Sequence, residues 1–145
     1  MIQADLALIG VKAEIKSPDW SEYSKRMAQG EHEMGLYGWT AIYGDPDSFF
    51  YSLLSCYAAK TNGPNMAKFC HPSYDQLVSR ARTIANPTLR VPLYEEAQLI
   101  FKEQAPWLTI ANSKQFVVVR KELLNFRLSP FGRHLFYGVE LEKQP

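Results

Sequence analysis

The amino-acid sequence predicts a mixed α/β fold (α+β mixed), with helices packed on a small mixed sheet. Two observations predict this class. Helix-type and strand-type hydrophobic patterns alternate along the first 40 residues, and short apolar runs return after the last long helical pattern. The chain has 145 residues, 46% of them hydrophobic and 21% charged. This composition is typical of a chain that buries a core, and it excludes an intrinsically disordered one.

Four elements are expected before residue 41. They are a helix over residues 1–9 that stops at Gly10, a strand over 11–16, a helix from Ser17 to Gly30, and a strand over 34–40. Glycine suits the left-handed position that ends a helix. Ser17 is a suitable N-cap and Pro18 fits the first helical position. Residues 11–16 alternate apolar and charged side chains, which indicates a half-buried strand.

Six further elements are expected after residue 44. Asp45 is suited to cap a helix whose first residue is Pro46. The remaining elements are helices over 72–84 and 88–104 and strands over 107–111, 116–119 and 139–141. Pro92 falls early in the second of these helices, where a lost backbone hydrogen bond costs least.

Charge, hydropathy and the N-terminus restrict the class of protein. A formal net charge of +1 gives no support for a nucleic-acid binder. No apolar run approaches the roughly 18–20 residues of a membrane span. The first residues contain neither a basic region nor a small-residue cleavage site, so they do not read as a signal peptide.

Two cysteines flank a segment rich in turn-forming residues. Cys56 and Cys70 stand on either side of residues 60–65, which carry a strong loop signal. The spacing alone is compatible with a disulfide or with two buried free thiols. A zinc site is less favoured, because His71 is the only close third ligand and no second cysteine pair exists.

Catalytic patterns are weak. Asp45 and Asp47 flank a proline and are better explained as a helix start than as paired catalytic carboxylates. The histidines at 32, 71 and 134 share no helical face with metal-ligand partners, and no nucleophile elbow or phosphate-binding glycine loop is present. A small hydrolase using Asp45, Asp47 or His134 stays open as an alternative. Trp39 and Tyr43 are compatible with a core or with a ligand cleft.

An ordered set of motifs resembles the extracellular solute-binding proteins of peptide-type ABC importers. The motifs run from Ile9-Gly10-Val11-Lys12 through Gly38-Trp39-Thr40, Gly44-Asp45-Pro46-Asp47 and Leu93-Tyr94-Glu95-Glu96-Ala97 to Pro130-Phe131-Gly132-Arg133. Within that family the sequence resembles the dipeptide-binding members most, together with their haem-binding and antimicrobial-peptide-sensitivity relatives.

The resemblance implies how the chain is organised. Family members are longer, with two lobes that close on a ligand and a signal peptide far upstream, so this chain resembles a C-terminal portion. Residues 1–112 would belong to the second ligand-binding lobe, and residues 113–145 would cross back to the first. The resemblance also implies periplasmic localisation and a disulfide between Cys56 and Cys70, which that compartment permits.

The resemblance further implies a non-enzymatic binding function. The expected ligand is a small peptide, or alternatively haem or another ligand without a free amine, and the expected partner is the membrane permease of the importer. No cofactor, metal or nucleic acid is expected, and a dimer through exposed apolar surface is an alternative partner. The implied ligand-binding residues are Gly38, Trp39, Thr40, Ala41, Ile42, Tyr43 and Asp45. In peptide-binding members an aspartate three positions after the tryptophan holds the ligand's ammonium, and here that position is Ile42.

Overall fold

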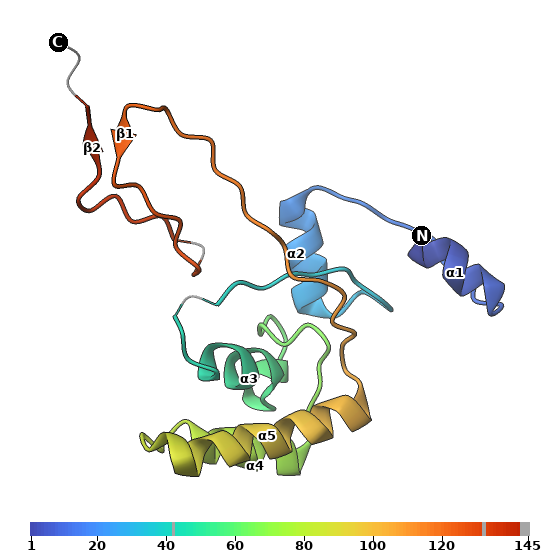
Figure 1. Ribbon diagram of the computed structural model, residues 1–145. Coiled ribbons are helices and arrows are strands. Elements are labelled where there is room, and N and C mark those ends of the chain that lie inside the picture. Colours follow the sequence, from blue (N-terminus) through green and yellow to red (C-terminus); the bar gives the residue numbers. More distant parts are fainter. Residues whose placement is uncertain (42, 132, 143–145) are drawn as a thin grey trace.

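The computed structural model describes residues 1–41, 43–131 and 133–142. Their elements, in chain order, are α1 (Ile2–Leu8), α2 (Trp20–Gln29), α3 (Asp47–Leu54), the 3₁₀ helix η1 (Tyr57–Ala59), α4 (Pro72–Ala81), α5 (Pro87–Gln104), β1 (Leu123–Leu124) and β2 (Glu140–Leu141) (Figure 1). Helices and strands are both present, and the mixed α/β class is confirmed.

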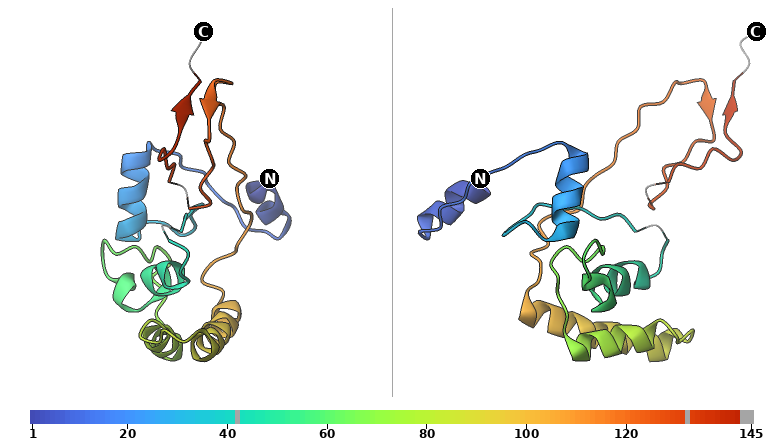
Figure 2. Two further views of the ribbon diagram at one scale, coloured as in Figure 1. Left: turned by 60° about the vertical axis from the view of Figure 1, so that its left-hand side comes forward. Right: turned by 180° about the vertical axis from the view of Figure 1, so that it is seen from behind.

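The hydrophobic core lies among α3, α4 and α5. Its buried members include Leu54, Tyr74, Val78 and Ala97, all fully or almost fully removed from solvent. Helices α4 and α5 lie side by side at one end of the molecule, with α3 packed against α4 (Figures 1 and 2). This three-helix body is the only part of the described chain with a continuous core of this size.

Helix boundaries follow local capping chemistry. Helix α2 begins at Trp20 because the Asp19 carboxylate accepts the backbone N–H of Glu22 at 3.1 Å, so the expected cap at Ser17 is wrong. Gly30 ends α2 in the left-handed conformation, as predicted, with φ of 78°. Asn86 caps α5 through Thr88 N–H at 2.9 Å, which places the start of that helix close to the expected one.

The expected strands are mostly not formed within the described chain. Its sheet consists of β1 and β2 alone, antiparallel, with Leu123 opposite Leu141. The segments expected as strands at 11–16, 34–40, 107–111 and 116–119 have no strand assignment, and the sheet is antiparallel and not mixed as expected. A strand requires a hydrogen-bonding neighbour, and within the described residues β1 and β2 are the strands that pair.

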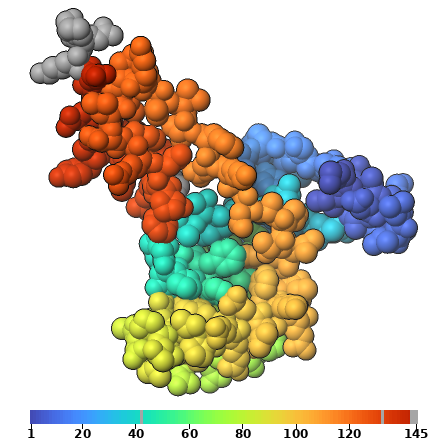
Figure 3. Space-filling view, viewed as in Figure 1, coloured from blue at the N-terminus to red at the C-terminus, as the bar shows by residue number. Residues whose placement is uncertain are grey.

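The molecule has an open shape. Helix α1 projects from one side and the β1–β2 ladder from another, each away from the three-helix body (Figure 3). The accessible surface is 11659 Å², against about 7,600 Å² expected for a compact monomer of this mass. Many large apolar side chains are therefore exposed, among them Leu108, Phe116 and Val118. Among the described helices, none has the length and hydropathy that a bilayer crossing requires.

Candidate functional site

An open pocket forms where three separate segments of the chain meet. Residues 38–41 form one wall, residues 111–113 and 115 form a second, and residues 128–130 form the third. The pocket volume is about 670 Å³, which is in the range of small-ligand sites. Four of the residues expected to bind ligand, Gly38, Trp39, Thr40 and Ala41, therefore lie together on one pocket wall.

The backbone of the wall at 38–41 is not engaged by the rest of the described chain. These residues belong to no helix or strand, and none of the hydrogen bonds between described residues uses their backbone N–H or C=O groups. Trp39 is 42% exposed, so its ring is not a core side chain. An extended segment with unused backbone groups can add a peptide ligand as a neighbouring strand.

Helix α2 holds the segment that leads into this wall. The Tyr23 hydroxyl donates to the backbone carbonyl of Leu36 at 2.8 Å. Gly35 lies against Met27, where a Cβ atom at position 35 would approach Met27 Cε to 2.6 Å. The Tyr37 ring stacks on Trp20 with a centroid separation of 5.7 Å. A larger residue at position 35 would require the end of the Met27 side chain to shift, and together these contacts hold the segment that leads into the wall against α2.

The other end of the wall is held by a bidentate ion pair. Asp45 Oδ2 accepts from Arg90 Nη1 at 2.6 Å, and Asp45 Oδ1 accepts from Arg90 Nη2 at 2.7 Å. The same Oδ1 accepts the backbone N–H of Asp47 at 2.8 Å at the start of α3. Arg90 is further held by the Ala81 carbonyl and the Tyr94 hydroxyl, at 3.0 and 3.1 Å. Asp45 thus joins the pocket loop to α3 and α5.

Charge complementarity sets the titration of this pair. The hydrogen bonds from Arg90 lower the pKa of the Asp45 carboxyl and outweigh the opposing effect of burial, and the bond from Asp47 N–H lowers the pKa further. Asp45 in turn affects Arg90: the hydrogen bond to the Asp45 carboxylate raises the pKa of the Arg90 guanidinium. Both groups are therefore charged throughout the ordinary pH range.

The sequence prediction of the site included residues that the pocket does not use directly. Tyr43 is 48% exposed but is not among the described pocket residues, and neither is Asp45. Ile42 lies outside the described residues. The sequence missed Arg90, the second wall and the third wall. No local pattern marks Arg90, because its partner is 45 positions earlier in the chain.

The disulfide between Cys56 and Cys70 is present. The loop that it closes is organised around Asn65, whose side chain is fully buried and bonds the backbone of Ser55 and Phe69. Lys68 Nζ donates to the Ala28 carbonyl at 2.8 Å, which satisfies a free carbonyl at the end of α2. The disulfide loop thereby contacts the helix that holds the pocket wall.

The arrangement does not favour the hydrolase alternative. Asp45 is bonded to Arg90 and to a backbone amide at a helix start, and Asp47 lies 3.3 Å from Arg82 Nε. None of Asp45, Asp47 and His134 is among the described residues of the pocket at Trp39. Within the described chain, no group of three His, Cys, Asp or Glu side chains is placed to hold a metal ion.

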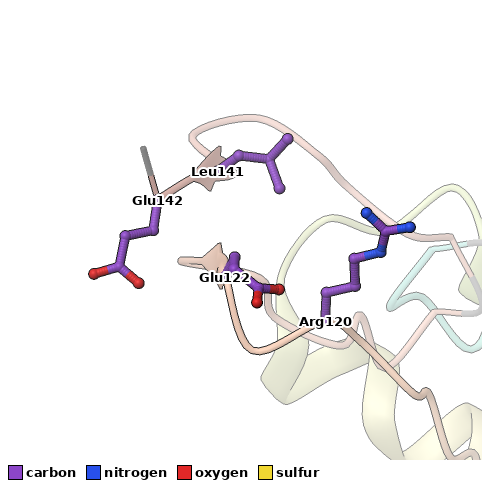
Figure 4. Close-up of a pocket in the computed structure, with 4 residues that line it drawn as sticks. All are labelled: Arg120, Glu122, Leu141 and Glu142. Atoms are coloured by element: carbon purple, nitrogen blue, oxygen red, sulfur yellow. The ribbon is translucent and has the colours of Figure 1, made fainter. Parts of the chain in front are cut away.

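A second depression, beside the β1–β2 ladder, is no better as a site. It is lined by Arg120, Glu122, Leu141 and Glu142. The guanidinium of Arg120 and the carboxylate of Glu142 point away from each other and not toward a common centre (Figure 4). Its side chains therefore do not converge on a ligand position.

Comparison with known proteins shows what this chain is similar to. The family described as bacterial extracellular solute-binding proteins, family 5 Middle, matches residues 1–61. The dipeptide-binding protein of Escherichia coli (strain K12) is 44% identical over 142 residues, which are 98% of this chain and 26% of that protein. Heme-binding protein A of Haemophilus influenzae is 37% identical over 142 residues, again 98% of this chain and 26% of that protein.

The fold agrees with these sequence matches. The crystal structure of the dipeptide-binding protein from Pseudoalteromonas sp. SM9913, in complex with Met-Leu, superposes with a TM-score of 0.87 at 33% identity, over 97% of this chain and 28% of that chain. The chain spans about a quarter of the length of the relatives it matches. In sequence and in fold, the chain is similar to part of the bacterial extracellular solute-binding proteins of family 5.

Proposed function

We propose that this chain is part of the substrate-binding component of an ABC importer, and that it contributes one wall of a peptide-binding cleft. In this proposal Gly38, Trp39, Thr40 and Ala41 contact the ligand, with Tyr43 at the rim. The function is capture and delivery of the ligand, without catalysis. Delivery would be to the membrane permease of the importer, from the periplasm.

One observation carries the proposal. The segment 38–41, implied by family resemblance to bind ligand, is largely exposed, belongs to no helix or strand and keeps its backbone groups unused by other described residues. It also lines a pocket of small-ligand size. A peptide bound there would pair its own amides with this backbone, which gives affinity largely independent of side-chain sequence. Such tolerance is what an importer of short peptides requires.

The chain organisation is proposed in the same terms. Residues 1–112 would form part of one ligand-binding lobe and residues 113–145 would lead to the other. In support, an extended segment separates the three-helix body from the β1–β2 ladder (Figure 1). The pocket is lined by residues on both sides of the proposed division, 38–41 and 111–112 before it and 113, 115 and 128–130 after it. The exposed apolar side chains would then be covered by the rest of the longer protein.

Haem is the second ligand suggested by a relative. Haem iron is usually held by His, Met, Cys or Tyr. None of the described residues that line the pocket is one of these four types. We therefore favour a peptide over haem.

Binding by the longer protein that contains this chain tests the proposal. Isothermal titration calorimetry with short peptides, free and N-acetylated, should show micromolar binding, and Trp39→Ala should weaken it at least tenfold. Tyr57→Ala is the aromatic control, because Tyr57 is 67% exposed, lies outside the pocket and is not among the residues that hold the pocket wall. Equal losses in the two variants, or no binding to the unaltered protein, would contradict the proposal.

The 145-residue chain alone is expected to bind such peptides weakly, because its pocket is open. Micromolar binding by the isolated chain would contradict a cleft shared with another lobe.

The proposed alternative partner, a second copy bound through exposed apolar surface, has no support in the comparisons. Size measurement at increasing concentration tests it directly, and a constant monomeric mass would contradict it.

A further inference from the structure

The pocket at Trp39 is electrically neutral on every described wall. Eleven described residues line it, and none carries a formal charge. Its polar groups are hydroxyls and amides, such as Thr40, Asn112 and Gln115. These groups form hydrogen bonds but provide no counter-charge for an ion.

The first carboxylate after the wall along the sequence is Asp45, and its charge is already paired with that of Arg90. Asp45 is two residues beyond Tyr43, and both of its oxygens accept hydrogen bonds from Arg90. One of them also accepts the N–H of Asp47. The Arg90 side chain is 19% exposed and the Asp45 side chain 37%. An ammonium group approaching Asp45 would have to compete with a bidentate guanidinium that is itself held at Ala81 and Tyr94.

A free peptide carries a charged ammonium at one end. Removing that charge from water into a closed cleft is costly unless an opposite charge or several oriented dipoles receive it. An internal amide or a blocked amine has no such cost, and its N–H and C=O groups match the unused backbone groups at 38–41. The neutral pocket therefore fits a neutral stretch of ligand better than a charged terminus.

We infer that the ligand presents an uncharged amide segment to this pocket, and that the protein accepts peptides whose amino terminus is blocked. Arg90 contributes as a positioning residue, because it occupies Asp45 and keeps the loop after the wall neutral. The inference rests on the proposed function and adds the class of peptide to it.

Matched peptides test the inference in the longer protein that contains this chain. Calorimetry compares Ala-Phe with N-acetyl-Ala-Phe at pH 7, and both again with Asp45→Asn. The acetylated peptide should bind as tightly as the free dipeptide or more tightly, and Asp45→Asn should change the ratio of the two dissociation constants by less than threefold. A preference of more than threefold for the free amine, or a selective loss of free dipeptide in Asp45→Asn, would overturn the inference.

The outcomes also separate this inference from the proposed function. Tight binding of the free dipeptide alone contradicts the inference and leaves the proposed function intact. Binding of neither peptide contradicts the proposed function, and the inference falls with it. The comparison of the two peptides on the unaltered protein requires no substitution, so it decides the question even where Asp45→Asn does not fold.

Discussion

Asp45 receives both terminal nitrogens of Arg90, at 2.6 and 2.7 Å, across 45 positions of sequence. The pair connects the loop that follows the pocket wall to helix α5. Bidentate geometry of this kind is stronger and more directional than an ordinary surface ion pair. The position of the wall therefore depends on a residue that touches no ligand in our proposal.

Replacing Arg90 by alanine should destabilise the chain. The change removes the bonds to Asp45, Ala81 and Tyr94 together, and leaves Asp45 without its guanidinium partner. We expect the free energy of unfolding to fall by about 1–2 kcal/mol, a range set by the partial exposure of the pair. Urea denaturation followed by circular dichroism measures it. Arg80→Ala is the control, because Arg80 is exposed and forms no side-chain ion pair with the described residues; a loss of equal size there would contradict a specific effect of Arg90.

The same pair predicts a loss of stability in acid. Hydrogen bonds from Arg90 lower the pKa of Asp45 in the folded chain, whereas the unfolded carboxyl titrates near the ordinary value of about 3.9. The contribution of the pair is therefore complete above that value and is lost as the pH falls through the lower folded pKa. We expect the stability difference between the unaltered chain and Asp45→Asn to shrink below about pH 4. A difference that stays constant from pH 7 to pH 2 would show that the carboxylate charge is not the cause.

Local chemistry made parts of the fold predictable from sequence. Gly30 ends α2 because glycine takes that backbone conformation without strain, and α5 begins close to the residue that the sequence predicts. The segment 38–41 was placed in the site by family resemblance, and its exposure was not evident from apolar character alone. The strands were overpredicted because alternation indicates which face is apolar, not whether a partner strand exists. Arg90 was missed for a similar reason, since nothing in its own neighbourhood indicates a carboxylate 45 positions away.

The disulfide should stabilise the loop between its cysteines. Cross-linking two residues 14 positions apart is worth about 3 kcal/mol in the chain-entropy account. The double variant Cys56→Ser with Cys70→Ser should lose about that much free energy of unfolding, and reducing agent should destabilise the unaltered chain but not the variant. Because Lys68 and Asn62 both donate to the Ala28 carbonyl, hydrogen exchange should also accelerate at the end of α2. Unchanged exchange there would contradict the link between the loop and that helix.

Asn65 should be the most sensitive polar residue of this loop. Its amide is fully buried, donates to the carbonyls of Ser55 and Phe69, and accepts the N–H of Phe69. Asn65→Ala leaves those groups without a partner and opens a cavity, so we expect a loss of about 2–4 kcal/mol in chemical denaturation. Gln76→Ala, on the exposed face of α4, is the matched amide control and should cost less than about 0.5 kcal/mol. Similar losses at both positions would contradict the assigned structural role of Asn65.

Ile42 offers a gain-of-function test of how this protein treats a free amine. Peptide-binding members of the family resembled here carry an aspartate three positions after the tryptophan, and a carboxylate there can receive an ammonium through a charge-assisted bond. In the longer protein, Ile42→Asp should tighten binding of Ala-Phe about tenfold, equivalent to about 1.4 kcal/mol, and should not tighten binding of N-acetyl-Ala-Phe. Ile42→Asn is the control, because it changes size and polarity as the aspartate does but adds no charge. A gain with asparagine equal to that with aspartate would exclude charge as the cause, and no gain with either would place the peptide's amine away from position 42.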